Sequence, residues 1–214
     1  MESFSVSGAR IWIDETARLI AENAENLTVL DTAIGDGDHG NNMDRGFSAV
    51  EKKLETANVG DPSALFKLVG MTLLSTVGGA AGPLYGGFFL ALARASSGKQ
   101  SLNKEELVQC LREGLADIQR RGKAQPGDKT MVDTLAPALE TLAATSDRDI
   151  TTGTKAAAET ARRAAEATIP MLARKGRASY LAERSIGHQD PGATSSSLLL
   201  QALASACNSQ RAGG

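Results

Sequence analysis

The segment DTAIGDGDHGNNM, residues 31–43, gathers residue types that bind cations. It holds Asp31, Asp36 and Asp38 together with three glycines, two asparagines and a histidine. Ionised carboxylates that lie close together repel one another, so a fold that gathers them needs a compensating positive charge. A divalent cation is the simplest source of that charge, and Mg²⁺ prefers carboxylate oxygens and phosphates. The spacing therefore predicts a metal site formed by these three aspartates.

Two standard motifs begin in this chain and are not completed. Asp36 would open a calcium-binding EF-hand loop, but the fifth place is Gly40 and the twelfth is Phe47. In GKAQPGDKT, an extra Asp128 precedes Lys129, and no strand precedes the loop, which excludes a Walker nucleotide loop. The chain has only two histidines, His39 and His188. We expect each to form hydrogen bonds beside bound phosphates and not to ligate a metal.

Glycine-rich runs occur at four places along the chain. The glycine-rich runs cover residues 35–46, 75–87, 121–133 and 173–195. Glycine lets the backbone approach a ligand closely, and the start of a following helix offers free N–H groups and the positive end of its dipole. A single run of this kind is also typical of a helix C-cap or a tight turn. Four runs together with an acidic cluster favour a phosphate-binding site.

Apolar residues recur at spacings of three and four along almost the whole chain, which predicts amphipathic helices. About eight helices are expected, over residues 13–27, 43–54, 65–73, 84–92, 107–118, 131–142, 154–173 and 193–206. Helix-start signals occur at Asp61-Pro62 and at 101–105, and only 28–30 resembles a strand. The sequence thus predicts an all-α fold of antiparallel helices in an up-and-down barrel or bundle.

The order of these helices predicts where the glycine-rich runs meet. One helix precedes the first run, three precede the second, five the third and seven the fourth. In an up-and-down bundle all four runs then lie at the same end. That end would combine carboxylates for a metal, backbone N–H groups for phosphate, and the positive charges of Lys129, Arg174, Lys175 and Arg177.

Composition limits the remaining classes of function. The 23 Lys and Arg against 25 Asp and Glu give a formal charge of −2, without the positive excess that nucleic-acid binding uses. No apolar run approaches the roughly 20 residues that span a bilayer, and no signal peptide is recognisable. We expect Cys110 and Cys207 to be free thiols without a chemical role, which suits a reducing compartment, and we therefore expect a cytoplasmic protein. We expect one domain over residues 1–214, with a frayed tail at 207–214.

Four stretches carry a resemblance to a known family over nearly the whole chain. They are DTAIGDGDHGNNMDRGF, MTLLSTVGGAAGPLYG, RGKAQPGDKTMVD and ARKGRASYLAERSIGHQDPGATS, of which the last is very specific. They closely resemble the nucleotide-binding L subunit of bacterial dihydroxyacetone kinase. The resemblance implies an eight-helix antiparallel barrel that holds ADP or ATP through two Mg²⁺ ions at one end.

The resemblance also assigns residues to the site. It places the metals on Asp31, Asp36 and Asp38. It surrounds the nucleotide with His39, Gly40, Asn41, Asn42, Gly79, Ala80, Ala81, Gly82, Gly122, Thr130, Met131, Arg177, Asp190, Pro191 and Gly192. Arg177 and Lys129 are the expected catalytic residues, because they would offset charge that develops on the transferred group. Ala81 stands where the family often has serine, so we expect neighbouring backbone N–H groups to replace that hydroxyl.

The implied function is phosphoryl transfer to a ketose bound on a separate K subunit, with ADP recharged by a phosphotransferase-system protein. Three alternatives stay open from the sequence: a kinase subunit for a tetrulose such as erythrulose, a regulatory module that senses ADP without catalysis, and a structural bundle whose acidic cluster holds Ca²⁺. Beyond these partners the chain could form a homodimer. No nucleic-acid or membrane partner is expected.

Overall fold

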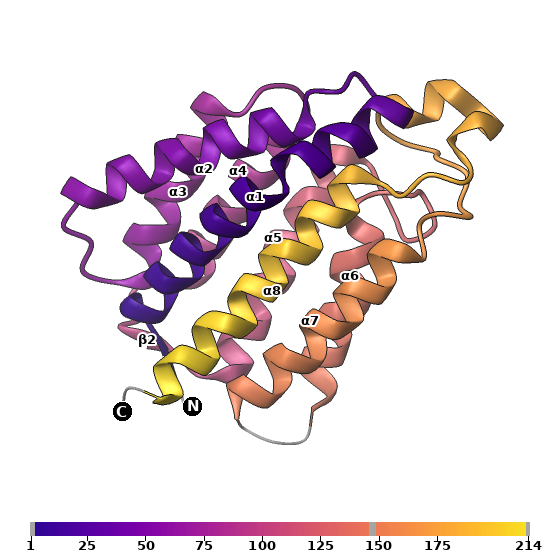
Figure 1. Cartoon of the computed structure of the whole chain (residues 1–214). Coiled ribbons are helices and arrows are strands. Elements are labelled where there is room, and N and C mark those ends of the chain that lie inside the picture. Colours follow the sequence, from indigo (N-terminus) through magenta and orange to yellow (C-terminus); the bar gives the residue numbers. More distant parts are fainter. Residues whose placement is uncertain (1–2, 146–148, 213–214) are drawn as a thin grey trace.

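The computed structural model describes residues 3–145 and 149–212, and it confirms the all-α prediction (Figure 1). Its α-helices are α1 (Val6–Ile34), α2 (His39–Thr56), α3 (Pro62–Thr76), α4 (Ala81–Ala95), α5 (Lys104–Gly122), α6 (Met131–Ala144), α7 (Ile150–Glu166) and α8 (Pro191–Ala212). A 3₁₀ segment, η1 (Arg177–Ser185), precedes α8, and the short strands β1 (Phe4–Ser5) and β2 (Ser101–Leu102) pair antiparallel.

The helices form a closed ring. Each α-helix packs against the next one along the chain, and α8 packs against α1. In Figure 1, α1 and α8 lie side by side, the two chain ends lie at one end of the bundle, and η1 lies at the opposite end. This alternation places every second connection at the η1 end, as the helix order predicts.

Local signals set several helix starts. Asn103 accepts a hydrogen bond from the backbone N–H of Glu106, whose carboxylate accepts one from the backbone N–H of Asn103. This reciprocal pair is a capping box, and it satisfies two N–H groups that a helix start leaves free. At the start of α3, the Asp61 carboxylate accepts from the N–H of Ala64 in the same way.

Two local predictions need correction. The helix expected over 154–173 is α7, which ends at Glu166, because Pro170 lacks an N–H and the Thr168 hydroxyl donates to the carbonyl of Ala165. The strand-like residues 28–30 lie within α1. Within the expected tail, 207–214, helix α8 continues to Ala212 and Cys207 is buried; the fraying stays a prediction, and residues 213–214 lie outside the described part.

The main hydrophobic core fills the ring. Its largest side chain, Trp12, packs against Phe4, Phe66 and Phe89, and its indole N–H donates to the carbonyl of Leu199 at 2.9 Å. The thiols of Cys110 and Cys207 are both buried and free, as expected. Over the described ranges, no helix is both long and apolar enough to cross a membrane.

Candidate functional site

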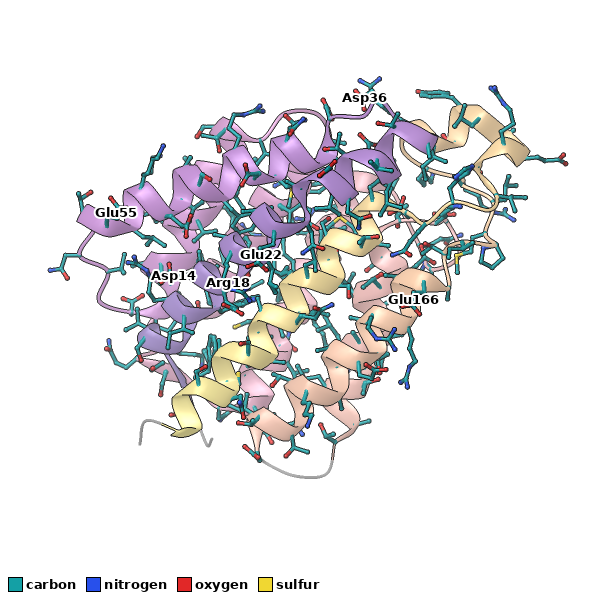
Figure 2. The ribbon with its side chains drawn as sticks, viewed as in Figure 1. Asp14, Arg18, Glu22, Asp36, Glu55 and Glu166 are labelled. Carbon is teal, nitrogen blue, oxygen red and sulfur yellow. The ribbon has the colours of Figure 1, made fainter. Side chains whose placement is uncertain are left out.

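The three aspartates predicted to bind a metal lie together where α1 passes into α2. One oxygen from each of Asp31, Asp36 and Asp38 can be chosen so that all three lie within 4.8 Å of one another. Asp31 is buried, whereas Asp36 and Asp38 are exposed, and Figure 2 shows Asp36 on the loop that follows α1. This set of oxygens suits a hard divalent cation such as Mg²⁺, which binds a few carboxylates and completes its coordination with water or phosphate.

The backbone of the loop holds the Asp31 carboxylate in place. Its Oδ2 accepts hydrogen bonds from the N–H of Asp38 at 2.8 Å and of His39 at 3.1 Å. These N–H groups belong to the start of α2, where no side chain of the N-cap residue Asp38 serves as a cap. A carboxylate at the end of α1 therefore also stabilises the start of α2.

Two glycines of this loop have specific steric roles. A Cβ on Gly35 would lie 2.1 Å from Oδ1 of Asp31, so only glycine leaves that carboxylate in its present place. Gly37 has φ 72°, in the left-handed region that other residues adopt at a cost. Both glycines therefore serve the placement of the aspartates.

The four glycine-rich connections line one cavity at this end of the bundle. From the sequence-predicted set, its wall contains Asp31, Asp36, Asp38, His39, Asn42, Gly79, Ala80, Ala81, Lys129, Thr130, Met131, Arg177, Asp190, Pro191 and Gly192. The wall also includes Lys175 and Gly176 from the segment before η1. The geometry thus brings together segments that are more than 150 residues apart in the sequence, as the helix order predicts.

Four residues of the set predicted to surround the nucleotide do not line the cavity, namely Gly40, Asn41, Gly82 and Gly122, and neither does the predicted phosphate neighbour Arg174. Gly40 allows α2 to contact α1 closely, because a Cβ there would lie 1.9 Å from the carbonyl oxygen of Ala24. Gly82 has a similar packing role, with the carbonyl oxygen of Val77 at 2.3 Å from such a Cβ. Asn41 and His188 are exposed, and His188 also lies outside the cavity wall.

The start of α4 offers backbone N–H groups to the cavity. Its N-cap residue, Ala80, has no side chain that could cap the helix, and Ala81 follows as the first helical residue. The first-turn N–H groups lack intrahelical partners and are available to an anion. This supports the expectation that the backbone replaces the hydroxyl missing at Ala81.

Arg177 lies beside the aspartates. Its Nη2 is 3.1 Å from Oδ2 of Asp36, and the Arg177 side chain remains 67 % exposed. An exposed pair of this kind contributes little to stability, about 0–1 kcal/mol. The guanidinium is therefore both close to the predicted metal site and able to move to a ligand.

Lys129, which the sequence predicts as a catalytic residue, is buried among backbone carbonyl groups. It lies in the cavity wall with no exposed surface, and its Nζ donates to the backbone carbonyls of Met171, at 3.1 Å, and of Ser185. A third carbonyl, of Ile169, lies at 3.5 Å. Burial lowers the pKa of Lys129, and the charge of Asp190 partly offsets this. The ammonium group thus braces the segment that carries Arg177, and this geometry argues against direct action on phosphate.

Burial shifts the pKa values of two polar groups in the wall. Burial raises the pKa of Asp190 to about 7, while its hydrogen bond from the N–H of Ala193 and the charge of Lys129 act in the opposite direction. Burial lowers the pKa of His39, and the nearby Asp31 and Asp38 partly oppose this. Such shifts are common at functional sites.

Sequence reasoning missed two residues that are hydrogen-bonded in series to His39: Tyr85, which lines the cavity, and Ser195, which does not. The Nε2 atom of His39 lies 2.8 Å from the Ser195 hydroxyl, which lies 2.7 Å from the hydroxyl of Tyr85. Both missed residues fall inside the glycine-rich runs 75–87 and 173–195. Their positions in these runs are the one sequence feature that indicates a place near the site. Helical spacing gives no reason to place them against His39.

The comparison with known protein families agrees with this geometry. The family model described as the DAK2 domain matches residues 33–205. The chain belongs to the DAK2 domain family. This DAK2 protein is 50% identical over 195 residues to the "PEP-dependent dihydroxyacetone kinase, ADP-binding subunit DhaL" of Escherichia coli (strain K12), covering 90% of this chain and 93% of that protein.

Further similarity extends to longer kinases. The DAK2 protein is 35% identical over 189 residues to the L-erythrulose 1-kinase of Mycolicibacterium smegmatis, covering 87% of this chain and 33% of that one. It also resembles the crystal structure of the dihydroxyacetone kinase from C. freundii in complex with AMP-PNP and Mg²⁺. That match has a TM-score of 0.73 and 28% identity, and it covers 96% of this chain and 34% of the other.

Proposed function

We propose that this chain is the nucleotide-binding, phosphoryl-donating subunit of a dihydroxyacetone kinase. The observation that carries the proposal is the convergence of the three aspartates with the start of α4 on one cavity. Carboxylates beside free backbone N–H groups match the two halves of a Mg²⁺–nucleotide complex, the cation and the phosphates. Similarity to a protein named as an ADP-binding subunit supports the same assignment.

Asp31, Asp36 and Asp38 would hold Mg²⁺, with Asp31 fixed by two backbone N–H groups and the other two free to adjust. A Mg²⁺ ion held by these aspartates would supply positive charge to offset the negative charge that develops during phosphoryl transfer. Two ions, as the family resemblance implies, are part of this proposal. Backbone N–H groups from the start of α4 would bind the phosphates, and the turn 190–192 would contact the remainder of the nucleotide.

Arg177 is the proposed catalytic residue. Its guanidinium lies 3.1 Å from Asp36, and its exposure leaves it able to reach a transferred phosphoryl group at the mouth of the cavity. A planar guanidinium can offer two parallel N–H donors to phosphate oxygens. Phosphoryl transfer needs little covalent chemistry from the protein, so positioning and charge stabilisation can supply most of the rate.

The ketose would bind to a separate K subunit. A small hydroxylated substrate needs several directional hydrogen bonds, since a misplacement of about 1 Å can cost 10²-fold in rate. The polar groups described above are all assigned to metal and nucleotide. We propose that the K subunit docks at the η1 end, where Tyr180 is 88 % exposed and lies in the same 3₁₀ segment as Arg177.

Two further features belong to the proposal. A phosphotransferase-system phosphocarrier would recharge a retained ADP; the name of the E. coli relative calls that kinase PEP-dependent and that subunit ADP-binding, which supports this part of the proposal. The similarity to an L-erythrulose 1-kinase supports a tetrulose as the second candidate substrate. A cytoplasmic location is also proposed, because buried free thiols suit a reducing compartment.

The direct test is a transfer assay with the purified chain. With Mg²⁺–ATP and dihydroxyacetone, the chain alone should bind nucleotide and show only background phosphorylation. Addition of a ketose-binding partner subunit should restore transfer, and Arg177→Ala should reduce that transfer more than it reduces nucleotide affinity. Robust turnover by the single chain, retained after size-exclusion chromatography, would contradict the division between two subunits.

A further inference from the structure

A chain of buried hydroxyl groups leads from α8 and α4 to His39. The Tyr85 hydroxyl lies 3.0 Å from Oγ of Ser196 and 2.7 Å from Oγ of Ser195. Ser195 Oγ in turn lies 2.8 Å from Nε2 of His39. Ser196, Tyr85 and Ser195 are called the hydroxyl chain below, and all three are buried.

The Ser196 proton determines which hydroxyl donates and which accepts along the hydroxyl chain. Within the described residues, Tyr85 is the only hydrogen-bond partner of the Ser196 hydroxyl. If Tyr85 donated to Ser196, the Ser196 proton would be buried without an acceptor, which costs about 1–3 kcal/mol. Ser196 therefore donates to Tyr85, and the phenol proton goes to Ser195, the nearer of its two neighbours.

The proton of Ser195 then goes to His39. Ser195 accepts from Tyr85, so its own proton has two possible acceptors, Nε2 of His39 at 2.8 Å and the carbonyl of Gly192 at 3.2 Å. O–H···O bonds normally span about 2.5–3.0 Å, so the carbonyl is a poor acceptor here. Nε2 lies within ordinary hydrogen-bond distance, and as an acceptor it carries no proton.

We propose that the hydroxyl chain fixes His39 in the tautomer with its proton on Nδ1, so that Nδ1–H is a donor to a phosphate oxygen. Nδ1 has no hydrogen-bond partner within the part of the chain that the structure describes, and His39 lines the cavity. Phosphate oxygens accept and do not donate at neutral pH, so the opposite tautomer would present a repelling lone pair. Ser195 and Tyr85 are thus positioning residues, and the phosphate part rests on the proposed nucleotide site.

Imidazole NMR tests the tautomer directly. Only His39 and His188 contribute signals, and His188 is exposed and outside the cavity, so His188→Gln identifies the His39 signal without disturbing the site. Long-range ¹H–¹⁵N spectra of the nucleotide-free protein, at a pH where the ring is neutral, should show Nδ1–H for His39. The Nε2–H tautomer in the wild-type protein would overturn the proposal.

A pair of serine variants separates positioning from packing. Ser195→Ala should shift His39 toward Nε2–H and weaken Mg²⁺–ADP binding about tenfold, the loss of roughly one hydrogen bond. Ser197→Ala, a buried control in the same helix, should leave the tautomer and the affinity unchanged. An unchanged His39 tautomer in folded Ser195→Ala would overturn the proposal. Should that variant fail to fold, the wild-type spectrum decides.

The same experiment distinguishes this inference from the proposed function. A wild-type chain that binds Mg²⁺–ADP while His39 carries its proton on Nε2 would refute only the role of the hydroxyl chain. A chain that shows Nδ1–H and does not bind Mg²⁺–ADP would refute the nucleotide site, and the role assigned to Nδ1–H would fall with it.

Discussion

Gly35→Ala should weaken Mg²⁺-dependent nucleotide binding although all three aspartates remain in the chain. The new Cβ would lie 2.1 Å from Oδ1 of Asp31, and real Cβ contacts are essentially never under 3.0 Å. The carboxylate must therefore move by about 1 Å, whereas metal–ligand distances tolerate only about 0.2 Å. Loss of this ligand, or of its correct orientation, should lower Mg²⁺–ADP affinity about 10- to 100-fold.

The fold should tolerate the same substitution. The φ of Gly35, −142°, lies outside the left-handed region that favours glycine, and the atoms nearest to a new Cβ belong to the Asp31 carboxylate. Movement of Asp31 would weaken its bonds from the N–H groups of Asp38 and His39, so we expect a loss of about 1–3 kcal/mol in the free energy of unfolding.

Calorimetry and denaturant unfolding measure the two effects separately. Gly60→Ala is the matched control, because a Cβ there has no neighbour within 4 Å and the site is distant in sequence. The control should bind Mg²⁺–ADP as the wild type does. Wild-type affinity in Gly35→Ala would refute the reasoning that Asp31 binds the metal in the orientation seen here.

Three further predictions address charge, bracing and pH. Asp36→Asn should reduce Mg²⁺–ADP affinity at least about 100-fold, while the metal-free chain keeps or gains stability because repulsion between like charges is relieved. Calorimetry measures the affinity and thermal unfolding measures the stability, with Asp44→Asn as the control. An unfolded variant that retains affinity would contradict the metal role. Lys129→Met should lower the free energy of unfolding by about 2–4 kcal/mol, because buried carbonyls lose their donor. The control Lys123→Met, at an exposed residue of the same loop, should change the free energy of unfolding little. Unchanged stability of Lys129→Met with lost phosphoryl transfer would instead favour a catalytic Lys129. Burial raises the pKa of Asp190 to about 7 in the folded state, against 3.8 for the unperturbed group, so the folded state binds this proton more tightly than the unfolded state does. The resulting contribution to stability is full below about pH 4 and is lost as the pH rises to about 7. It amounts to at most about 4 kcal/mol, and unfolding of Asp190→Asn in EDTA should lack this pH dependence, whereas equal slopes in both proteins would contradict it.

The sequence predicted the fold from periodicity and the site from helix order. Apolar spacing identified the helices, and alternating direction was enough to bring the four glycine-rich runs to one end, where the cavity lies. The aspartates lie together because only four residues separate Asp31 from the next one, and α1 ends between them. These features depend on local or topological rules that a sequence displays.

Other features depended on tertiary contacts that no local pattern displays. Lys129 belongs to a basic, glycine-rich run, and only the structure shows that its ammonium is enclosed by carbonyls from 169–185. The sequence predicts ligand contacts at Gly40 and Gly82, and only the structure shows that both lie outside the cavity wall and permit close packing. The contact of Ser195 with His39 spans 156 residues, so its partner could not be found from spacing.

Thermal unfolding with ADP, in Mg²⁺ and in EDTA, tests the shared metal–nucleotide site most directly. In the proposed site the aspartates and the phosphates bind the same ion, so each ligand should strengthen binding of the other. ADP at 100 times its Kd in Mg²⁺ should stabilise the chain by about 2.7 kcal/mol, which raises Tm by roughly 5–10 °C for a domain of this size. In EDTA the same ADP concentration should raise Tm far less. An equal rise in Tm with and without Mg²⁺ would contradict the shared site.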